Sequence, residues 1–514
     1  MTRQRNSKRA ERRAERLALP LLQMDFGTVR NAQRPFDFLA PEQIQKIHDA
    51  SLHILENVGV DFLDDEALSI WARAGAKVDF ASRHVWIDRG LLLEAIATAP
   101  PSFTWRARNP ERTVFIGQNQ INFAPNGGVV FVHDLDYGRR PGLMKDYINF
   151  LKLVQMCNAI HIAGDQLIVP HDVEVSFRHL RRSQAALKLT DKAYMEAPHG
   201  RIISGDAVEM AKIVFGDDIT ESNQPVLGGI INASSPLRYD DRMIGGILTF
   251  ARANQVLIIT PFILAGAMSP ITMAAAIAQQ NAEALAGIAL AQLARPGAPV
   301  IYGGFATNLD MKTGSPAFGT PEGAWATIVG AQMARFYNLP FRNSGTLNTS
   351  NLPDAQAAYE TMWAVWPAVL SHSNFIMHSV GWLEGGLTVG YEKMIIDMEN
   401  LGMFQHFFQE VEISDDTLAL DMIKEIGPGG HHLGTPHTQA RFRTEYYTPV
   451  LADRQNYESW QLSGVGDAAQ RANKIWKDVL NAYEQPPLDE AIRDALDDFV
   501  ARRTEELRGV ELYS

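Results

Sequence analysis

Cysteine is almost missing from this chain, since Cys157 is the single cysteine among 514 residues. One thiol cannot form an internal disulfide, and it excludes zinc and iron–sulfur sites built from several thiolates. We therefore expect a reducing compartment, the cytoplasm. The HExxH signature of metallohydrolases and a Gly-rich phosphate fingerprint are missing as well, so no metal site and no nucleotide site are predicted.

Positive charge is in the minority, with 47 Lys and Arg against 59 Asp and Glu and a net charge of −12. This balance argues against a nucleic acid or an anionic membrane surface as a partner. The apolar stretch 256–278 has the length of a membrane span, but Pro261, Ser269 and Pro270 divide it into strand, loop and helix start. We therefore expect a buried strand–helix unit there.

Short apolar runs alternate with helical patterns from about residue 129 onward. Near-continuous apolar runs are typical of parallel strands buried on both faces. The expected strands are Val129–Val132, His161–Ile168, Ala193–Met195, Val226–Ile231, Val256–Thr260, Val300–Tyr302, Pro340–Arg342 and Phe375–Met377. The expected helices are residues 143–158, 173–189, 204–215, 239–253, 271–294, 320–337, 354–371 and 391–410. This α/β order favours a closed (β/α)8 TIM barrel, with a doubly wound sheet as the rival if a short strand is false.

The remaining segments are expected to flank the barrel. Residues 1–17 are dense in Arg and Lys and lack the apolar core of a secretory signal. Short β-rich stretches precede the barrel, and two amphipathic helices end the chain. The expected parts are a disordered basic tail at 1–25, an N-terminal helical and β extension at 26–128, the barrel with the active site at 129–412, and a C-terminal loop and helices packing on the barrel at 413–514.

Functional side chains of a TIM barrel lie at or just beyond the carboxyl ends of the strands. The last strand–helix unit has three candidate functional side chains at this position, because His378, Trp382 and Glu384 follow Phe375–Met377. We take His378 and Glu384 as candidates for catalysis. The candidate substrate-binding residues are Trp382, Phe305, Phe262, Tyr302, Asn343, Glu196 and Asn232. Glycines that permit close approach of a cofactor or of a neighbouring loop are Gly303, Gly304, Gly385 and Gly386.

Several of these candidates are aromatic, although each ring taken alone is equally consistent with core packing. Rings that converge on one end of a barrel, with few charges, suit a quaternary ammonium ion, which has no hydrogen-bond donor. His431, His432 and His437 form the densest histidine group. Their Gly- and Pro-rich surroundings fit a surface or lid loop better than a metal site.

Three stretches together resemble the trimethylamine methyltransferase family (the MttB superfamily): PDAQAAYE (353–360), GWLEGGLTVGYEKMIIDMENLGMF (381–404) and DRQNYESW (453–460). Members of this family transfer a methyl group from methylated amines to a corrinoid protein. The resemblance implies a TIM barrel and a corrinoid (cobalamin) cofactor carried by a partner protein that docks at the carboxyl face. Members that demethylate trimethylamine contain pyrrolysine, whereas this chain has 514 standard residues. Members without pyrrolysine look like quaternary-amine demethylases, with glycine betaine as the best-known substrate type.

The resemblance therefore implies a methyltransferase that passes a methyl group from a quaternary amine such as glycine betaine to a Co(I) corrinoid. Such an amine leaves as a neutral tertiary amine, so the protein must mainly orient one N–methyl bond and exclude water. A carboxylate against the nitrogen would stabilise the substrate more than the transition state, so we expect Glu384 and Glu196 to orient loops. His378, Asn343 or Arg342 would serve as donors to a betaine carboxylate.

Two alternatives remain open from the sequence. One is a trimethylamine:corrinoid methyltransferase that acts without pyrrolysine, and the other is a non-catalytic binder of methylated amines. An exposed rim around the barrel mouth would favour the enzyme, because a binder needs no docking surface for a corrinoid protein. A homo-oligomer is expected as a further possibility.

Overall fold

A closed ring of parallel strands forms the centre of the computed structural model, which describes residues 21, 23–164 and 167–512. The order around the ring is β7 (Gln120–Phe123), β20 (Phe375–Met377), β19 (Phe341–Ser344), β16 (Val300–Gly303), β14 (Val256–Ile259), β12 (Leu227–Ile231), β11 (Ala193–Met195) and β10 (Ile162–Gly164). The amide of His161 donates a 2.9 Å hydrogen bond to the carbonyl of Phe123, which joins β10 to β7. The ring is therefore a TIM barrel, as predicted. Most of the basic tail expected at residues 1–25 lies outside the described residues.

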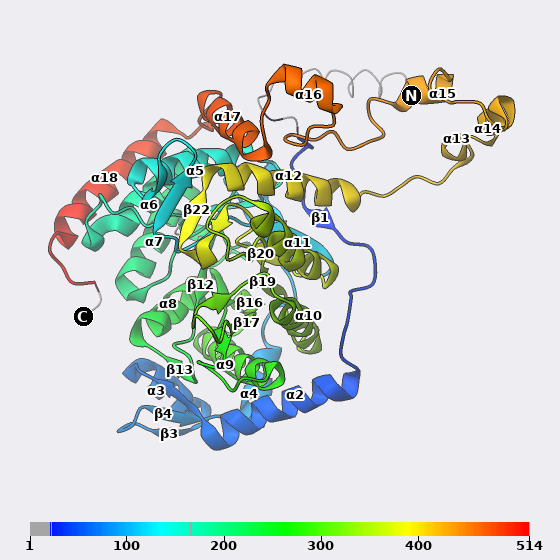
Figure 1. Cartoon of the computed structure of the whole chain (residues 1–514). Coiled ribbons are helices and arrows are strands. Elements are labelled where there is room, and N and C mark those ends of the chain that lie inside the picture. The colour runs from blue at the N-terminus through cyan, green and yellow to red at the C-terminus, as the bar shows by residue number, and fades with distance from the viewer. Residues whose placement is uncertain (1–20, 22, 165–166, 513–514) are drawn as a thin grey trace.

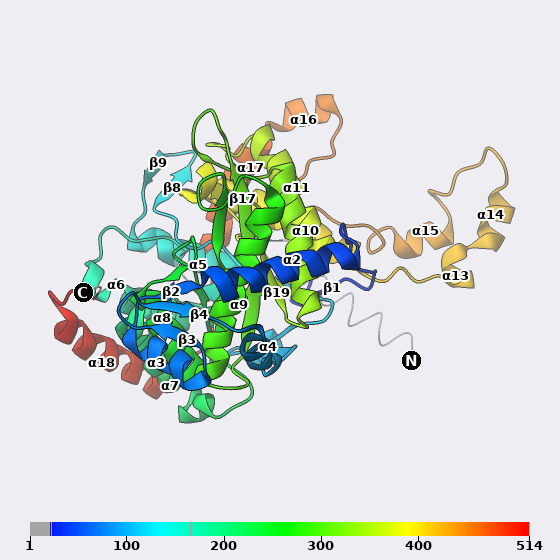
Figure 2. The same cartoon turned by 90° about the horizontal axis from the view of Figure 1, so that it is seen from below.

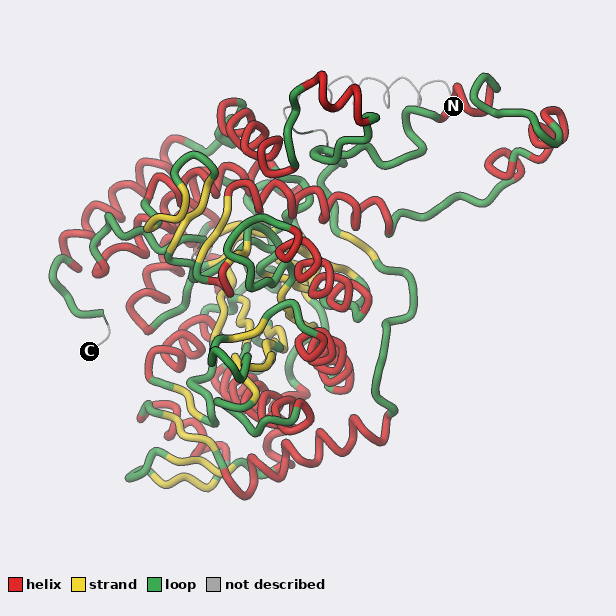
Figure 3. Tube along the Cα trace, viewed as in Figure 1, coloured by secondary structure: helices red, strands yellow, loops and turns green. Residues whose placement is uncertain are grey.

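Helices surround the strands on the outside of the barrel (Figures 1 and 3). They are α5 (Met144–Met156), α6 (Arg178–Leu189), α7 (Gly200–Phe215), α8 (Asp241–Arg252), α9 (Met273–Ala294), α10 (Pro321–Phe336), α11 (Ala355–Leu370) and α12 (Tyr391–Phe407). Polar caps fix several starts, since Asp240, Thr320 and Asp354 each accept a hydrogen bond from the backbone amide three residues later. The stretch 256–278 gives strands and the start of α9, and the described chain contains no helix long and apolar enough to cross a membrane.

The first barrel strand differs from the prediction. Val129–Val132 does not join the ring, because this region forms β8 (Phe131–Asp134) in a separate sheet with β9 (Gly138–Pro141), β22 (Thr388–Gly390) and β21 (Trp382–Leu383). The first strand is β7, within the segment expected to be the extension. Its sequence QINF lacks a continuous apolar run because Asn122 is buried and donates to the carbonyls of Phe115 and Asn374. A polar side chain that is satisfied inside the barrel hid this strand from the hydrophobic pattern.

A hairpin of the N-terminal segment closes the amino end of the barrel. It consists of β5 (Phe103–Trp105) and β6 (Val114–Ile116), and its side chains share a core with Ile301 and Phe375 of the barrel strands. The indole of Trp105 stacks on Phe375 with ring centroids 6.2 Å apart. A Cβ at Gly228 would lie 2.2 Å from that indole, so glycine is needed on the facing strand. The carboxyl end of the barrel is left for the site.

The C-terminal part combines packed helices with a projecting segment. α17 (Ala468–Asn481) packs on α12 and α5, and α18 (Glu490–Leu507) packs on α6 and α7. Between them and α12, residues 409–446 extend away from the barrel, as Figures 1 and 2 show. We call this segment the arm; it carries α13 (Asp415–Leu418), α14 (Leu420–Ile426) and α15 (Pro436–Arg441).

Candidate active site

His378 directly follows β20 and is buried, with a backbone φ of 54°. This left-handed conformation is uncommon for a residue with a Cβ and often marks a functional position. The amide of His378 donates to the carbonyl of Pro125 at 3.1 Å, and its carbonyl accepts from the amide of Thr346 at 2.7 Å. The hydroxyl of Thr346 donates to the same carbonyl at 2.8 Å. Loops from two neighbouring strands therefore hold the backbone of His378.

The imidazole of His378 lies between a hydroxyl and a buried cation. Its Nδ1 is 2.9 Å from the hydroxyl oxygen of Ser344. Burial, and then the nearby guanidinium of Arg342, hold the pKa of His378 well below its usual range. The imidazole is therefore neutral at physiological pH and is not a source of protons. Arg342 is itself buried, and its Nη1 is 3.4 Å from the carbonyl oxygen of Gly304.

Four aromatic rings form a connected cluster with His378. The His378 ring centroid is 4.6 Å from that of Trp382 and 5.6 Å from that of Phe305. Phe305 lies 4.8 Å from Phe262, and Phe318 lies 5.5 Å from Trp382, again between centroids. The guanidinium carbon of Arg342 is 5.3 Å from the Phe305 centroid. The structure thus brings three of the expected rings together, and Phe318 joins them.

Glu384 serves the hairpin that carries Trp382. Its carboxylate accepts two hydrogen bonds from Arg139, at 2.6 and 2.9 Å, and one from the hydroxyl of Thr388 at 2.5 Å. Burial raises the pKa of Glu384, but the bonds from Arg139 and Thr388 outweigh this effect and lower the pKa overall. Glu384 therefore ties β22 to β9, which is the loop-orienting role considered for it from the sequence.

The four candidate glycines accommodate neighbouring parts of the same chain. A Cβ at Gly303 would lie 1.9 Å from the hydroxyl of Thr260, and one at Gly386 would lie 2.5 Å from the indole of Trp382. A Cβ at Gly304 would lie 3.2 Å from the amide nitrogen of Gln280, and Gly385 has a φ of 60°. The close approach that these glycines permit is to an adjacent strand, helix or ring.

Four predicted residues do not join the ring cluster. Tyr302 points to the helical layer, where its hydroxyl donates to Asn281 of α9 at 2.9 Å. Glu196 is buried after β11, on the far side of the barrel from β19 and β20, and Asn232 after β12 is exposed. Asn343 accepts a 2.5 Å bond from the amide of Ser344, and its side chain lies among residues of α10.

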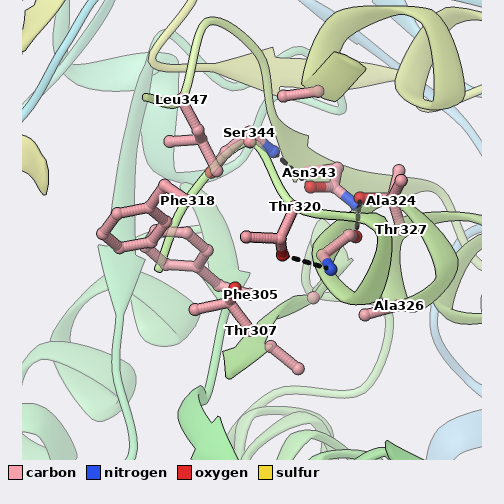
Figure 4. A pocket seen from close by; sticks show the side chains of 15 residues that line it. Phe305, Thr307, Phe318, Thr320, Ala324, Ala326, Thr327, Asn343, Ser344 and Leu347 are labelled. Atoms are coloured by element: carbon pink, nitrogen blue, oxygen red, sulfur yellow. Dashed lines mark hydrogen bonds between the residues drawn. The ribbon is translucent and has the colours of Figure 1, made fainter. Parts of the chain in front are cut away.

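A small pocket separates Asn343 from the rings. Figure 4 shows Phe305 and Phe318 on one side of it, with Asn343 and Thr327 on the other. Its open space is about 20 Å³, which holds about one water molecule. The trimethylammonium group of the substrate type expected from the sequence is much larger than this space.

Comparison with known proteins identifies the family. A sequence model described as trimethylamine methyltransferase (MTTB) matches residues 3–508. The chain belongs to this methyltransferase family. A glycine betaine methyltransferase of Desulfitobacterium hafniense (strain Y51) is 39% identical over 472 residues, covering 92% of this chain and 98% of that protein. The trimethylamine methyltransferase MttB of Desulfitobacterium hafniense (strain DSM 10664 / DCB-2) is 31% identical, covering 91% and 94%.

A solved structure supports the fold of this trimethylamine methyltransferase family member. The monomethylamine methyltransferase MtmB of Methanosarcina barkeri superposes with a TM-score of 0.53 over 88% of this chain and 90% of that chain, at 9% sequence identity. At this identity the likeness concerns the fold alone. In the described part of this chain, no three His, Cys, Asp or Glu side chains gather as metal ligands.

Sequence reasoning missed two residues of the site of this family member. Phe318 directly follows the short strand β18 (Pro316–Ala317), which pairs with β17 (Phe305–Leu309), and no periodic pattern singles it out. Arg139, which binds Glu384, belongs to a hairpin that was expected to be part of the barrel. Arg342 was not missed, because a charged residue inside a buried strand needs a partner or a ligand and so stands out in the sequence.

Proposed function

We propose that this chain demethylates a quaternary amine that carries a carboxylate, such as glycine betaine, and passes the methyl group to the Co(I) corrinoid of a separate protein. The observation that carries the proposal is the presence of a buried guanidinium, Arg342, beside aromatic rings in one barrel mouth. The relationship to a glycine betaine methyltransferase supports the substrate class.

The rings would bind the trimethylammonium group. A quaternary nitrogen cannot donate a hydrogen bond, so ring faces attract it through their quadrupole, typically by 0.5–2 kcal/mol per ring. Trp382 is the best placed, because its Nε1 donates to the carbonyl of Asn348 at 3.0 Å and fixes the indole. The neutral His378 adds a ring without adding a positive charge against the substrate.

Arg342 would bind the carboxylate of the substrate. A guanidinium and a carboxylate form charge-assisted hydrogen bonds that gain strength in a dry site. Ser344 and His378, which meet at 2.9 Å, lie next to Arg342 along β19 and β20 and are polar neighbours for the same group. A substrate held at both ends would have one N–methyl bond fixed in direction.

For this reaction the chain must orient the bound substrate and exclude water from the site. The reduced corrinoid supplies the nucleophile when its carrier protein is bound. The electron pair of the breaking carbon–nitrogen bond stays on nitrogen, so the amine leaves neutral and no proton has to move. Rings that exclude water and clamp the ammonium would hold the methyl carbon in line for transfer. A neutral His378 is consistent with a transfer in which no proton moves. A single cysteine is consistent with a cytoplasmic enzyme.

The carboxyl face fits a methyl acceptor carried by another protein. Exposed apolar side chains lie on the loops that follow the carboxyl ends of the barrel strands, and we call them the rim: Leu135, Tyr137, Ile271, Met311, Leu352 and Leu387. Exposed apolar patches of this kind mark protein contact sites. The rim favours an enzyme with a docking partner over a non-catalytic binder.

Titration calorimetry with glycine betaine, choline and trimethylamine tests the binding side of the proposal. We expect glycine betaine to bind tightest and Trp382→Ala to weaken it by about tenfold, which corresponds to about 1.4 kcal/mol. Phe80→Ala is the control variant, since that exposed ring lies in the turn after Lys77–Asp79 in the N-terminal segment. Equal affinity for choline and glycine betaine would show that Arg342 does not bind the substrate carboxylate. Preference for trimethylamine would contradict the proposed substrate class.

A further inference from the structure

The arm, residues 409–446, exposes many apolar side chains. Every residue of α13, α14 and α15 is partly or fully exposed. These helices have 4, 7 and 6 residues, while isolated helices below about 12–15 residues are marginal in water. The exposed apolar side chains of the arm are Val411, Ile413, Leu418, Leu420, Ile423, Leu433, Phe442 and Tyr446.

We propose that the arm packs on a second copy of this chain in a reciprocal, two-fold exchange. The arm exposes eight apolar side chains, and one side of a standard protein interface buries roughly 800 Å². Two arms related by a two-fold axis would each bury these side chains. This inference is independent of the methyl-transfer proposal.

The outer face of the barrel offers a surface for the incoming arm. Aromatic side chains of α11, of the end of α10 and of the segment crossing them are exposed by 43–64%, and we call them the aromatic face: Phe36, Phe38, Phe336, Tyr359 and Trp363. The amide of Phe36 bonds the carbonyl of Leu370, which places the crossing segment at the end of α11. Exposed rings are uncommon on a monomer and are enriched in interfaces.

The arm and the aromatic face are neighbours at the root of the arm. Phe407, the last residue of α12, is 63% exposed and its ring centroid is 5.5 Å from that of Trp366 in α11. Each copy therefore presents the root of its own arm next to the face that would receive the other arm. In a two-fold interface the same patch serves both copies, and this adjacency is what such an interface needs.

Location argues for a second copy over the corrinoid protein. The corrinoid must reach the carboxyl ends of the strands, where the rim lies. Barrel helices run back from that end, so the arm leaves α12 on the opposite side.

Sedimentation velocity of the full-length protein tests the exchange. We expect the wild type to sediment as a dimer or a larger even-numbered assembly. The double variant Leu420→Asp/Ile423→Asp and, separately, Trp363→Glu should each shift it to smaller species, with circular dichroism unchanged. Phe80→Asp is the matched control, since Phe80 and Ile423 are both 55% exposed. A monomeric wild type, or an assembly that ignores both the arm and the face variants, would overturn the proposal.

Cysteine cross-linking tells whether the contact is between copies. The natural Cys157 is buried, so Leu420→Cys and Trp363→Cys introduce the accessible thiols. A bismaleimide should join the two variants when they are mixed as subunits, and Phe80→Cys mixed with either should stay unlinked. In the double variant diluted with excess wild type, a cross-link confined within one chain would show that the arm folds back, which overturns the exchange. If the Asp variants keep the wild-type size yet lose transfer to a corrinoid protein while free cobalamin still reacts, the cover is the corrinoid protein instead.

Discussion

The hydroxyl oxygen of Ser344, the last residue of β19, lies 2.9 Å from Nδ1 of His378, the residue after β20. The contact joins two adjacent strands at the barrel mouth and orients the imidazole toward the rings. Burial, with Arg342 second, keeps the pKa of this imidazole well below its usual range. His378 therefore enters the account as a neutral positioning group.

The pH dependence of kcat/KM tests that role. A lowered pKa means that His378 stays neutral throughout the range from pH 6 to 8, so the rate should be flat there. We expect His378→Ala to lower kcat/KM by about 100-fold through misplacement of the substrate and Ser344→Ala by about tenfold. The profiles are measured with glycine betaine and reduced cobalamin. A rise in rate through an apparent pKa near the ordinary value of 6.5 for histidine would contradict the neutral role.

Arg342 provides a test of carboxylate recognition. Arg342→Met keeps a similar side-chain volume and removes the charge. The Kd for glycine betaine should therefore rise at least tenfold, which corresponds to about 1.4 kcal/mol of binding free energy. Choline has no carboxylate and should bind as before or better, because one buried positive charge has been removed. Calorimetry with both ligands on both proteins gives the comparison. A parallel loss for choline would mean that Arg342 is a structural residue of the barrel.

Lys393 and Asp397 form a buried ion pair one turn apart in α12, beneath the site. Asp397 also accepts a 2.7 Å bond from the amide of Gly381, and Lys393 donates to Thr361 at 3.0 Å. Lys393→Met leaves an unpaired carboxylate and should lower the free energy of unfolding by roughly 3–5 kcal/mol. Lys393→Met/Asp397→Asn should recover most of that loss in urea denaturation. Equal losses in the single and double variants would show that the charges are not coupled.

His161 makes the barrel sensitive to acid at its closure. Its Nδ1 accepts from the amide of Phe123 and its Nε2 donates to the carbonyl of Gly27, each at 2.9 Å. Burial lowers its pKa to about 3. The unfolded chain binds this proton below pH 6.5 and the folded chain does not, so stability falls as the pH falls from 6.5 toward 3.

The loss attributable to His161 should be roughly 2 kcal/mol at pH 5 relative to pH 7. Urea denaturation at both pH values measures it, with His161→Gln as the variant that keeps an acceptor and cannot titrate. The variant should show a smaller difference between the two pH values than the wild type. An equal difference in both proteins would assign the acid sensitivity to other buried groups.

The sequence was most informative where burial is uniform. Seven barrel strands and all eight surrounding helices lie within a few residues of their predicted positions, because these strands are buried on both faces and most of them are apolar. Strand β7 was not predicted, because it contains the polar Asn122, whose hydrogen-bond partners lie inside the barrel. In the candidate site, strand-end position singled out His378, Trp382, Phe305 and Phe262, and the structure brings these four side chains together.

The position of a residue relative to a strand end did not predict the direction in which its side chain points. Tyr302 and Asn343 are on barrel strands near the mouth, yet alternation turns both toward the helices. Phe318 reaches the cluster from just after β18, and the partner of Glu384 comes from a hairpin far away in sequence. Contacts of this kind depend on how loops cross the mouth, which local patterns do not record.

The most direct test of the central claim is methyl transfer itself. Purified protein is mixed with chemically reduced free cobalamin and, in separate reactions, glycine betaine, proline betaine, carnitine, choline or trimethylamine, and the Co(I) to methyl-Co(III) absorbance change is followed. We expect turnover with a carboxylate-bearing quaternary amine, strongest for glycine betaine, and none with trimethylamine. Turnover with trimethylamine, or tight binding of a betaine without transfer to cobalamin or to a corrinoid protein, would contradict the account.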